Sequence, residues 1–246
     1  MSDQKQGGEQ ASQNLFSLKL GEYTVRCLGA ADGTTDRIVY MHAAMPGETD
    51  KVWQLLSCKC VLVGIEGIDW NRDMSPWRHP GVFARGEDFA GGADAYLREL
   101  CGRIIPETER RINSYIGAEF GGITRRYLSG YSLGGLFALY TLYQTDLFEG
   151  VSSASGSLWY DGFISYMREH EMRRKPGKVY LSIGDREAGG NPRMKTVSER
   201  TAEAARLVRE QGIPVVLEYN PGGHFQDVPV RIARGIDWLL REEADG

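Results

Sequence analysis

A serine inside a Gly-x-Ser-x-Gly pattern is the strongest chemical signal in this chain. Ser132 lies in the segment GYSLG (130–134), after the apolar run 126–129 and at the start of the apolar stretch 134–143. Strand, tight turn and helix in this order form the nucleophile elbow of serine hydrolases. The opening N–H groups of such a helix face the serine, so the Leu133 N–H can bind a developing oxyanion. The pattern alone is weak in a chain with 31 glycines, but its surroundings favour a nucleophile over an ordinary turn serine.

A serine nucleophile needs a base, and the chain offers four histidines. His42 ends an early apolar run, His79 lies in the loop before the elbow, and His170 lies in a charged stretch. His224 instead follows the last apolar run, in the turn-rich segment PGGHF. The chain order of α/β-hydrolases is serine, acid, histidine, so we predict His224 as the general base.

The acid should lie between these two residues, after the penultimate apolar run 178–183. Asp185 and Glu187 both follow that run. Either carboxylate can accept the imidazole N–H and fix its tautomer. Because the Glu187 side chain reaches further toward the His224 loop, we predict Glu187, with Asp185 as the alternative acid; Asp227, or no acid at all, remains open.

A second oxyanion donor is expected from the loop that follows the early run 37–41. This loop is His42-Ala43-Ala44-Met45, and its position alone predicts a backbone N–H near Met45. The small side chains of Ala43 and Ala44 allow a substrate to approach the backbone.

Short apolar runs that alternate with helical patterns must position these residues. The runs end in small or polar residues and span 37–41, 60–64, 125–130, 150–155, 178–183 and 214–219; helical patterns span 50–56, 93–112, 134–143, 193–210 and 228–241. The alternation predicts the α/β class, with a single doubly wound, mostly parallel sheet and helices on both faces, as in the α/β-hydrolase fold. Residues 15–29 predict an antiparallel hairpin that turns at Gly21-Glu22.

Length and composition limit the other function classes. We expect a disordered N-terminal tail at 1–14 and one domain over 15–246. The net charge of -4 argues against a nucleic-acid partner, and no apolar run is long enough to cross a membrane. Four cysteines without metal-ligand spacing predict reduced thiols, no metal, no cofactor and a cytoplasmic location. The expected partner is a small-molecule ester; the sequence does not indicate an oligomeric state.

The long segment 67–92 is rich in aromatic residues. Trp70 and Trp77 in it, together with Trp159, can form an aromatic wall beside the substrate, and Arg72 can bind an anion. The alternative is that the tryptophans pack the rim of the domain and that Arg72 is an ordinary surface residue.

Ser132, Glu187 and His224 in this order, with the segment SGYSLGGLFALY, resemble the Putative esterase branch of the α/β-hydrolases, and within it the enterochelin (siderophore) esterase group. Similar segments lie at 71–76, 91–97, 155–159 and 184–187. The resemblance spans about residues 37–240 and implies ester hydrolysis through a serine acyl-enzyme, on a catecholate trilactone in the siderophore branch. Relatives commonly carry Asp-Gly where this chain has Ala43-Ala44.

These observations predict a serine carboxylic ester hydrolase that acts through a triad, on a siderophore-type or aryl ester. Two alternatives remain at this point. The same acyl-enzyme can transfer its acyl group to an alcohol, or the fold can serve a non-catalytic ligand-binding protein.

Overall fold

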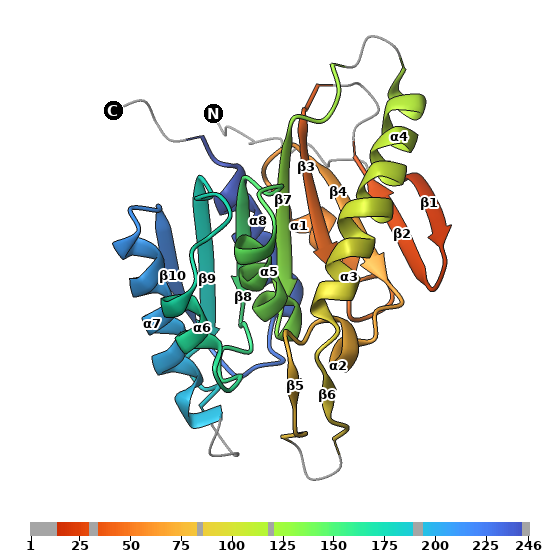
Figure 1. Ribbon diagram of the computed structural model, residues 1–246. Coiled ribbons are helices and arrows are strands. Elements are labelled where there is room, and N and C mark those ends of the chain that lie inside the picture. Colours follow the sequence, from red (N-terminus) through yellow and green to blue (C-terminus); the bar gives the residue numbers. More distant parts are fainter. Residues whose placement is uncertain (1–13, 30–33, 83–85, 118–120, 189–193, 243–246) are drawn as a thin grey trace, which may run out of the picture.

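The computed structural model describes residues 14–29, 34–82, 86–117, 121–188 and 194–242. One sheet of eight strands runs through the molecule in the order β1-β2-β4-β3-β7-β8-β9-β10 (Figure 1). The strands are β1 (Asn14–Leu20), β2 (Tyr23–Leu28), β3 (Arg37–His42), β4 (Val61–Glu66), β7 (Arg125–Tyr131), β8 (Gly150–Ala154), β9 (Lys178–Gly184) and β10 (Val215–Asn220). β2 pairs with β1 and β4 antiparallel, and all other neighbours are parallel. This confirms the expected fold class and the N-terminal hairpin.

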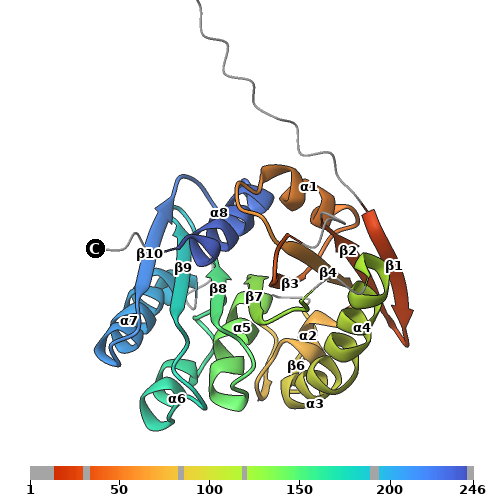
Figure 2. The same cartoon turned by 90° about the horizontal axis from the view of Figure 1, so that it is seen from above.

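Helices cover both faces of the sheet (Figure 2). α1 (Glu48–Leu55) and α8 (Val228–Leu240) lie on one face; α3 (Ala93–Glu99), α4 (Ile105–Ile116), α5 (Leu133–Gln144), α6 (Phe163–Glu169) and α7 (Val197–Glu210) lie on the other. α5 is apolar on all sides, and a helix of this kind is expected to be buried. Residues 134–143 of α5 are indeed buried. In the described ranges, no helix combines the length and the apolar character needed to span a bilayer.

The sheet is wound in two directions from its middle. The chain passes from β3 outward to β4, then returns to β7 on the other side of β3 and continues through β8, β9 and β10. The carboxyl ends of β3 and β7 therefore lie side by side at the switch point, where ligands bind in sheets of this kind. The loop after β3 and the turn at Ser132 both begin there.

The prediction of one continuous helix over 93–112 is wrong in detail, because the helix is interrupted. A π-helical turn at Leu100–Ile104 separates α3 from α4, and the Ile105 N–H donates to the Leu100 carbonyl five residues earlier. Pro106, near the start of α4, has no N–H for the carbonyl four residues before it. The widened turn lies directly ahead of the proline, and π-helix occurs mostly as single turns of this kind within α-helices.

The segment 67–92 is more structured than a long loop. It contains the short helix α2 (Trp70–Asp73) and a hairpin of β5 (Arg78–His79) and β6 (Phe89–Ala90), which extends beyond the carboxyl ends of the parallel strands (Figure 1). Residues 83–85 of this segment lie outside the described residues, as do Arg193 and residues 1–13; Asn14, expected in the tail, is the first residue of β1.

His42 ends β3 and is buried directly before the loop 43–46. Its ring packs against Tyr96 and Phe137, with centroid distances of 5.5 and 5.3 Å. Neither ring nitrogen has a hydrogen-bond partner in the described part of the chain. Burial lowers the pKa of His42 from 6.5 to about 3, so the ring stays neutral while the protein is folded.

This buried ring makes folding sensitive to acid. Between about pH 6.5 and pH 3 the unfolded chain binds a proton at His42 that the folded chain excludes, so stability is lost as the pH falls. At about pH 4.5 the loss amounts to roughly 3 kcal/mol. Urea unfolding of the wild type and His42→Leu at about pH 7 and pH 4.5 measures it: the variant should lose about 2–3 kcal/mol less between the two conditions. Equal losses would contradict the assignment.

Candidate active site

Ser132 occupies a strained turn between β7 and α5. Its φ of 55° and ψ of -120° are unusual for a residue with a side chain, and such strain concentrates at functional sites. Two hydrogen bonds tie the turn to the end of β8 and the loop after it: the Ser132 N–H donates to the Ala154 carbonyl over 3.1 Å, and the Ser132 carbonyl accepts from the Ser157 N–H over 2.9 Å. The surrounding backbone thus fixes where the hydroxyl points.

Glycines around the turn permit this close packing. A Cβ at Gly130 would lie 2.0 Å from the Gly134 carbonyl oxygen, and one at Gly135 would lie 3.0 Å from the Gly156 Cα. Strand β7, helix α5 and the loop after β8 therefore approach each other more closely than residues with side chains allow. Gly130 is also the first glycine of the Gly-x-Ser-x-Gly pattern.

The structure brings Ser132, His224 and Glu187 into one chain of hydrogen bonds. His224 Nε2 lies 3.0 Å from Ser132 Oγ, and His224 Nδ1 lies 2.8 Å from Glu187 Oε2. A carboxylate only accepts, so Nδ1 carries the proton and Nε2 is free to accept from the serine hydroxyl. The three side chains come from the loops after β7, β9 and β10, at the carboxyl ends of the strands.

Glu187 is buried and held on both oxygens. While Oε2 faces His224, Oε1 accepts from the Gly184 N–H at 2.7 Å and from Arg231 Nη1 at 2.8 Å. Burial alone raises the pKa of the Glu187 carboxyl, but the hydrogen bond and the charge of His224, with further hydrogen bonds, outweigh it and bring the pKa below its usual value. Glu187 is therefore ionised near neutral pH.

Arg231 is a component of this site that sequence reasoning missed. Its side chain is 1% exposed. Besides Glu187 it donates to the carbonyls of Pro221 and Gly223, each at 3.0 Å, in the loop that carries His224. One guanidinium thus ties the acid and the histidine loop together. The available signal was an arginine within the apolar helical stretch 228–240.

Asp185, the alternative acid, has a different contact. Its Oδ1 accepts from the Gly222 N–H at 2.7 Å, and its side chain is 57% exposed. Asp185 therefore joins the β9 turn to the histidine loop through the backbone. Asp227 is the N-cap residue of α8, in the left-handed region. Among the described residues, Glu187 is the carboxylate that contacts the His224 ring.

The predicted oxyanion donors differ in their surroundings. Leu133 is the first residue of α5, and an N–H in the first turn has no acceptor within the helix. In the loop after β3, the Ala43 N–H donates to a carbonyl of β4, and the Ala44 N–H donates to Glu48 Oε2 over 2.7 Å. The Met45 backbone, like that of Ala44, lowers the pKa of the Glu48 carboxyl through a hydrogen bond. The Met45 donor stays a prediction.

Two cavities meet at the serine. Both are lined by Ser132, Leu133, His224 and Phe225. The first, of about 330 Å³, is largely apolar and is called the Trp159 cavity; its other lining includes Val82, Phe89, Trp159, Met194 and Val197. The second, of about 590 Å³, is called the Glu48 cavity; its other lining includes Met45, Glu48, Lys51, Trp70 and Val228. An ester centred on Ser132 can extend into both.

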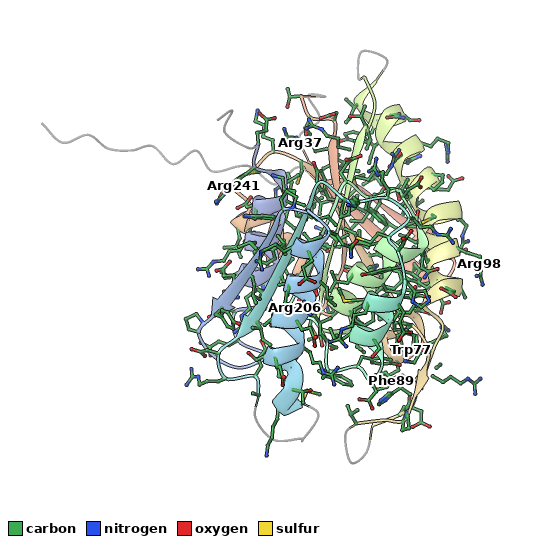
Figure 3. All side chains as sticks on the ribbon, turned by 60° about the vertical axis from the view of Figure 1, so that its left-hand side comes forward. Arg37, Trp77, Phe89, Arg98, Arg206 and Arg241 are labelled. Atoms are coloured by element: carbon green, nitrogen blue, oxygen red, sulfur yellow. The ribbon has the colours of Figure 1, made fainter. Side chains whose placement is uncertain are left out.

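The predicted substrate-binding residues divide between these cavities and other contacts. Trp70 lines the Glu48 cavity and Trp159 the Trp159 cavity. Trp77 lies at the same end of the molecule as Phe89 (Figure 3), but it packs on Tyr160 with ring centroids 5.8 Å apart and lines neither cavity.

Arg72 is also absent from the lining of both cavities. Its guanidinium pairs with Asp73 at 2.6 Å and with Glu22 at 3.1 Å. The structure therefore does not bring Arg72 to the serine, because its charge is already engaged by two carboxylates. In the described ranges, no group of three or more histidine, cysteine, aspartate or glutamate side chains is arranged to hold a metal ion.

Comparison with known proteins gives consistent relatives. The uncharacterized protein YbbA of Bacillus subtilis is 26% identical over 190 residues, 73% of this chain and 72% of YbbA. The ferri-bacillibactin esterase BesA of the same organism is 28% identical over 161 residues, 62% of this chain and 53% of BesA. The siderophore hydrolase EstA from Aspergillus nidulans has the same fold, with a TM-score of 0.73 at 18% identity over 98% of this chain and 97% of EstA.

The family described as Putative esterase matches residues 45–226. That range begins in the loop after β3, runs through the elbow and ends just past His224, so it contains the whole hydrogen-bonded chain described above. Because the match covers most of the sequence, this chain belongs to the Putative esterase family.

Proposed function

We propose that this protein hydrolyses carboxylic esters through a Ser132-His224-Glu187 triad and a covalent acyl-enzyme. The observation that carries the proposal is the pair of hydrogen bonds, 3.0 and 2.8 Å long, that links a strained serine to an imidazole and a buried carboxylate. Serine hydrolases use this geometry on several unrelated folds. Membership of the esterase family supports the reaction class.

In the first half of the reaction, Ser132 Oγ attacks the ester carbonyl while His224 Nε2 takes its proton. The ionised Glu187 stabilises the imidazolium and keeps the ring oriented. The Leu133 N–H binds the oxyanion of the tetrahedral intermediate, with the loop near Met45 as the second donor. When the intermediate collapses, His224 returns the proton to the leaving alcohol and the acyl group stays on Ser132.

In the second half, a water molecule replaces the alcohol. His224 takes a proton from the water, the resulting hydroxide attacks the acyl carbonyl, and the acid product leaves as Ser132 recovers its proton. If another alcohol took the place of water, the same steps would give acyl transfer. Product analysis with added alcohol separates the two reactions.

We propose a siderophore-type or aryl ester as the substrate class. The names of BesA and EstA support this choice, as do two cavities of several hundred Å³ that meet at the serine. The aromatic lining of the Trp159 cavity suits an aryl group. We propose the cytoplasm as the compartment, supported by the four free cysteines, Cys27, Cys58, Cys60 and Cys101.

An active-site phosphonate probe tests the nucleophile. A second serine, Ser157, lies only 3.2 Å from Ser132, measured between the hydroxyl oxygens, so peptide mass spectrometry must locate the adduct. We expect one adduct per chain on Ser132, none in Ser132→Ala, and continued labelling in the matched control Ser157→Ala. An adduct on Ser157 would contradict the assignment of Ser132 as the nucleophile. No adduct on folded wild type would contradict the proposed mechanism and favour a ligand-binding protein.

A further inference from the structure

The Glu48 cavity contains a buried carboxylate that the proposed mechanism does not use. Glu48 is the first residue of α1, and only 5% of it is exposed. It nevertheless lines the same cavity as Ser132 and His224. Few glutamates are this buried without a close cationic partner. Burial raises the pKa of the Glu48 carboxyl above its usual value, and the Ala44 and Met45 amides and the more distant charge of Lys51 offset this rise only in part.

The carboxylate still has room for a partner from the substrate. A carboxylate offers about four lone-pair positions, and the backbone amides of Ala44 and Met45 occupy at most two of them. The remaining cavity wall is mostly apolar, with Trp70 and Val228 among its residues. In such surroundings an added hydrogen-bond donor or positive charge offsets the cost of burying the carboxylate, while a second negative charge adds to it.

We propose that Glu48 determines substrate specificity in this cavity and selects an ester with an ammonium or hydroxyl group there over one with a carboxylate. The inference rests on the proposed esterase function and adds the chemical class of one half of the substrate. Lys51 is exposed at the same cavity. Because its charge is opposite to that of Glu48, it favours an ester with a carboxylate group over one with an ammonium group. The apolar rim, with Met45 64% and Phe225 90% exposed, adds no charge preference.

Two matched ester series test the proposal. In one, a fixed acyl group is joined to a four-atom alcohol chain that ends in an ammonium, methyl or carboxylate group. In the other, the same three ends are placed on the acyl chain and the alcohol is fixed. kcat/KM is measured for wild type, Glu48→Gln and Lys51→Gln. Glu48→Gln is the matched variant because its amide oxygen can still accept the Ala44 N–H, which preserves the loop.

For wild type we expect one series to favour the ammonium ester over the carboxylate ester by about 10-fold or more, the scale of one charge-assisted hydrogen bond. Glu48→Gln should lower this ratio about 10-fold, and Lys51→Gln should raise it; the other series should change little.

The possible failures are distinguishable. An equal loss on all three esters in Glu48→Gln, with an unchanged ratio, would mean that Glu48 only supports the loop and would overturn the specificity inference. If Glu48→Gln does not fold, the wild-type ratio decides: an ammonium ester that is hydrolysed no better than the carboxylate ester in either series overturns the inference. Wild type that does not hydrolyse even the methyl-ended esters would remove the proposed function and the inference together.

Discussion

Replacing Ser132 by alanine is expected to lower kcat roughly 10⁶-fold, because no acyl-enzyme can form. The fold should remain, since alanine keeps the Cβ and the backbone hydrogen bonds to Ala154 and Ser157 do not involve the side chain. Steady-state hydrolysis of a chromogenic ester measures the loss, and thermal unfolding followed by circular dichroism checks the fold. More than about 1% residual activity in a folded variant would exclude Ser132 as the nucleophile.

Substitution of His224 tests whether Ser132 acts together with a histidine base. His224→Ala should lose about as much activity as Ser132→Ala, and the double variant should lose no more than either, because residues of one triad act as a unit. Ser157→Ala serves as the matched control: the Ser157 hydroxyl oxygen lies 3.2 Å from that of Ser132, and among the described residues no hydrogen bond joins it to His224 or Glu187. Its effect should stay within about 10-fold. Additive losses in the double variant would argue against a shared proton relay.

The parallel part of the sheet was predictable from sequence because most of its inner strands, such as β3, β4, β8 and β9, are buried on both faces. Buried parallel strands are continuous apolar runs, and the six expected runs correspond to β3, β4, β7, β8, β9 and β10 within a residue or two. The π-turn at 100–104 was not predictable from apolar spacing, because the apolar positions continue at intervals of three and four through it. The proline at 106 was the local sign that a regular helix cannot continue.

The candidate triad residues could be proposed because each follows a strand end, and strand ends of a parallel sheet converge. Loop side chains such as Arg72 and Trp77 carry no such constraint. Arg72 pairs with Glu22, fifty residues away in sequence, and no local pattern reveals that contact. Arg231 and Glu48 were missed for a related reason: each is a charged residue on a helix, where the usual expectation is a solvated face.

Glu187→Gln is expected to lower kcat by about 10³–10⁴-fold while His224 and Ser132 remain in place. The reason is the tautomer. A glutamine can turn its NH₂ group toward His224 and donate to Nδ1. The ring proton then lies on Nε2, so this nitrogen can no longer accept the proton of the Ser132 hydroxyl. Ester hydrolysis under saturating substrate measures kcat. Asp185→Asn is the matched control for the alternative acid, and its kcat should stay within about 3-fold, because the exposed side chain can still accept the Gly222 N–H.

Glu187→Gln should also lower the free energy of unfolding. A carboxylate that acted only in catalysis would not have this effect on stability. Removing its charge leaves the guanidinium of Arg231, 1% exposed, without a charged partner, and breaking a buried pair in this way costs about 3–5 kcal/mol. Urea unfolding should show this loss in Glu187→Gln and almost none in Asp185→Asn. In Glu187→Gln/Arg231→Met the loss should be smaller than the sum of the single variants by at least about 1 kcal/mol, while activity stays low. Strict additivity, or an Asp185→Asn variant as inactive as Glu187→Gln, would show that the buried pair is not what orients the histidine.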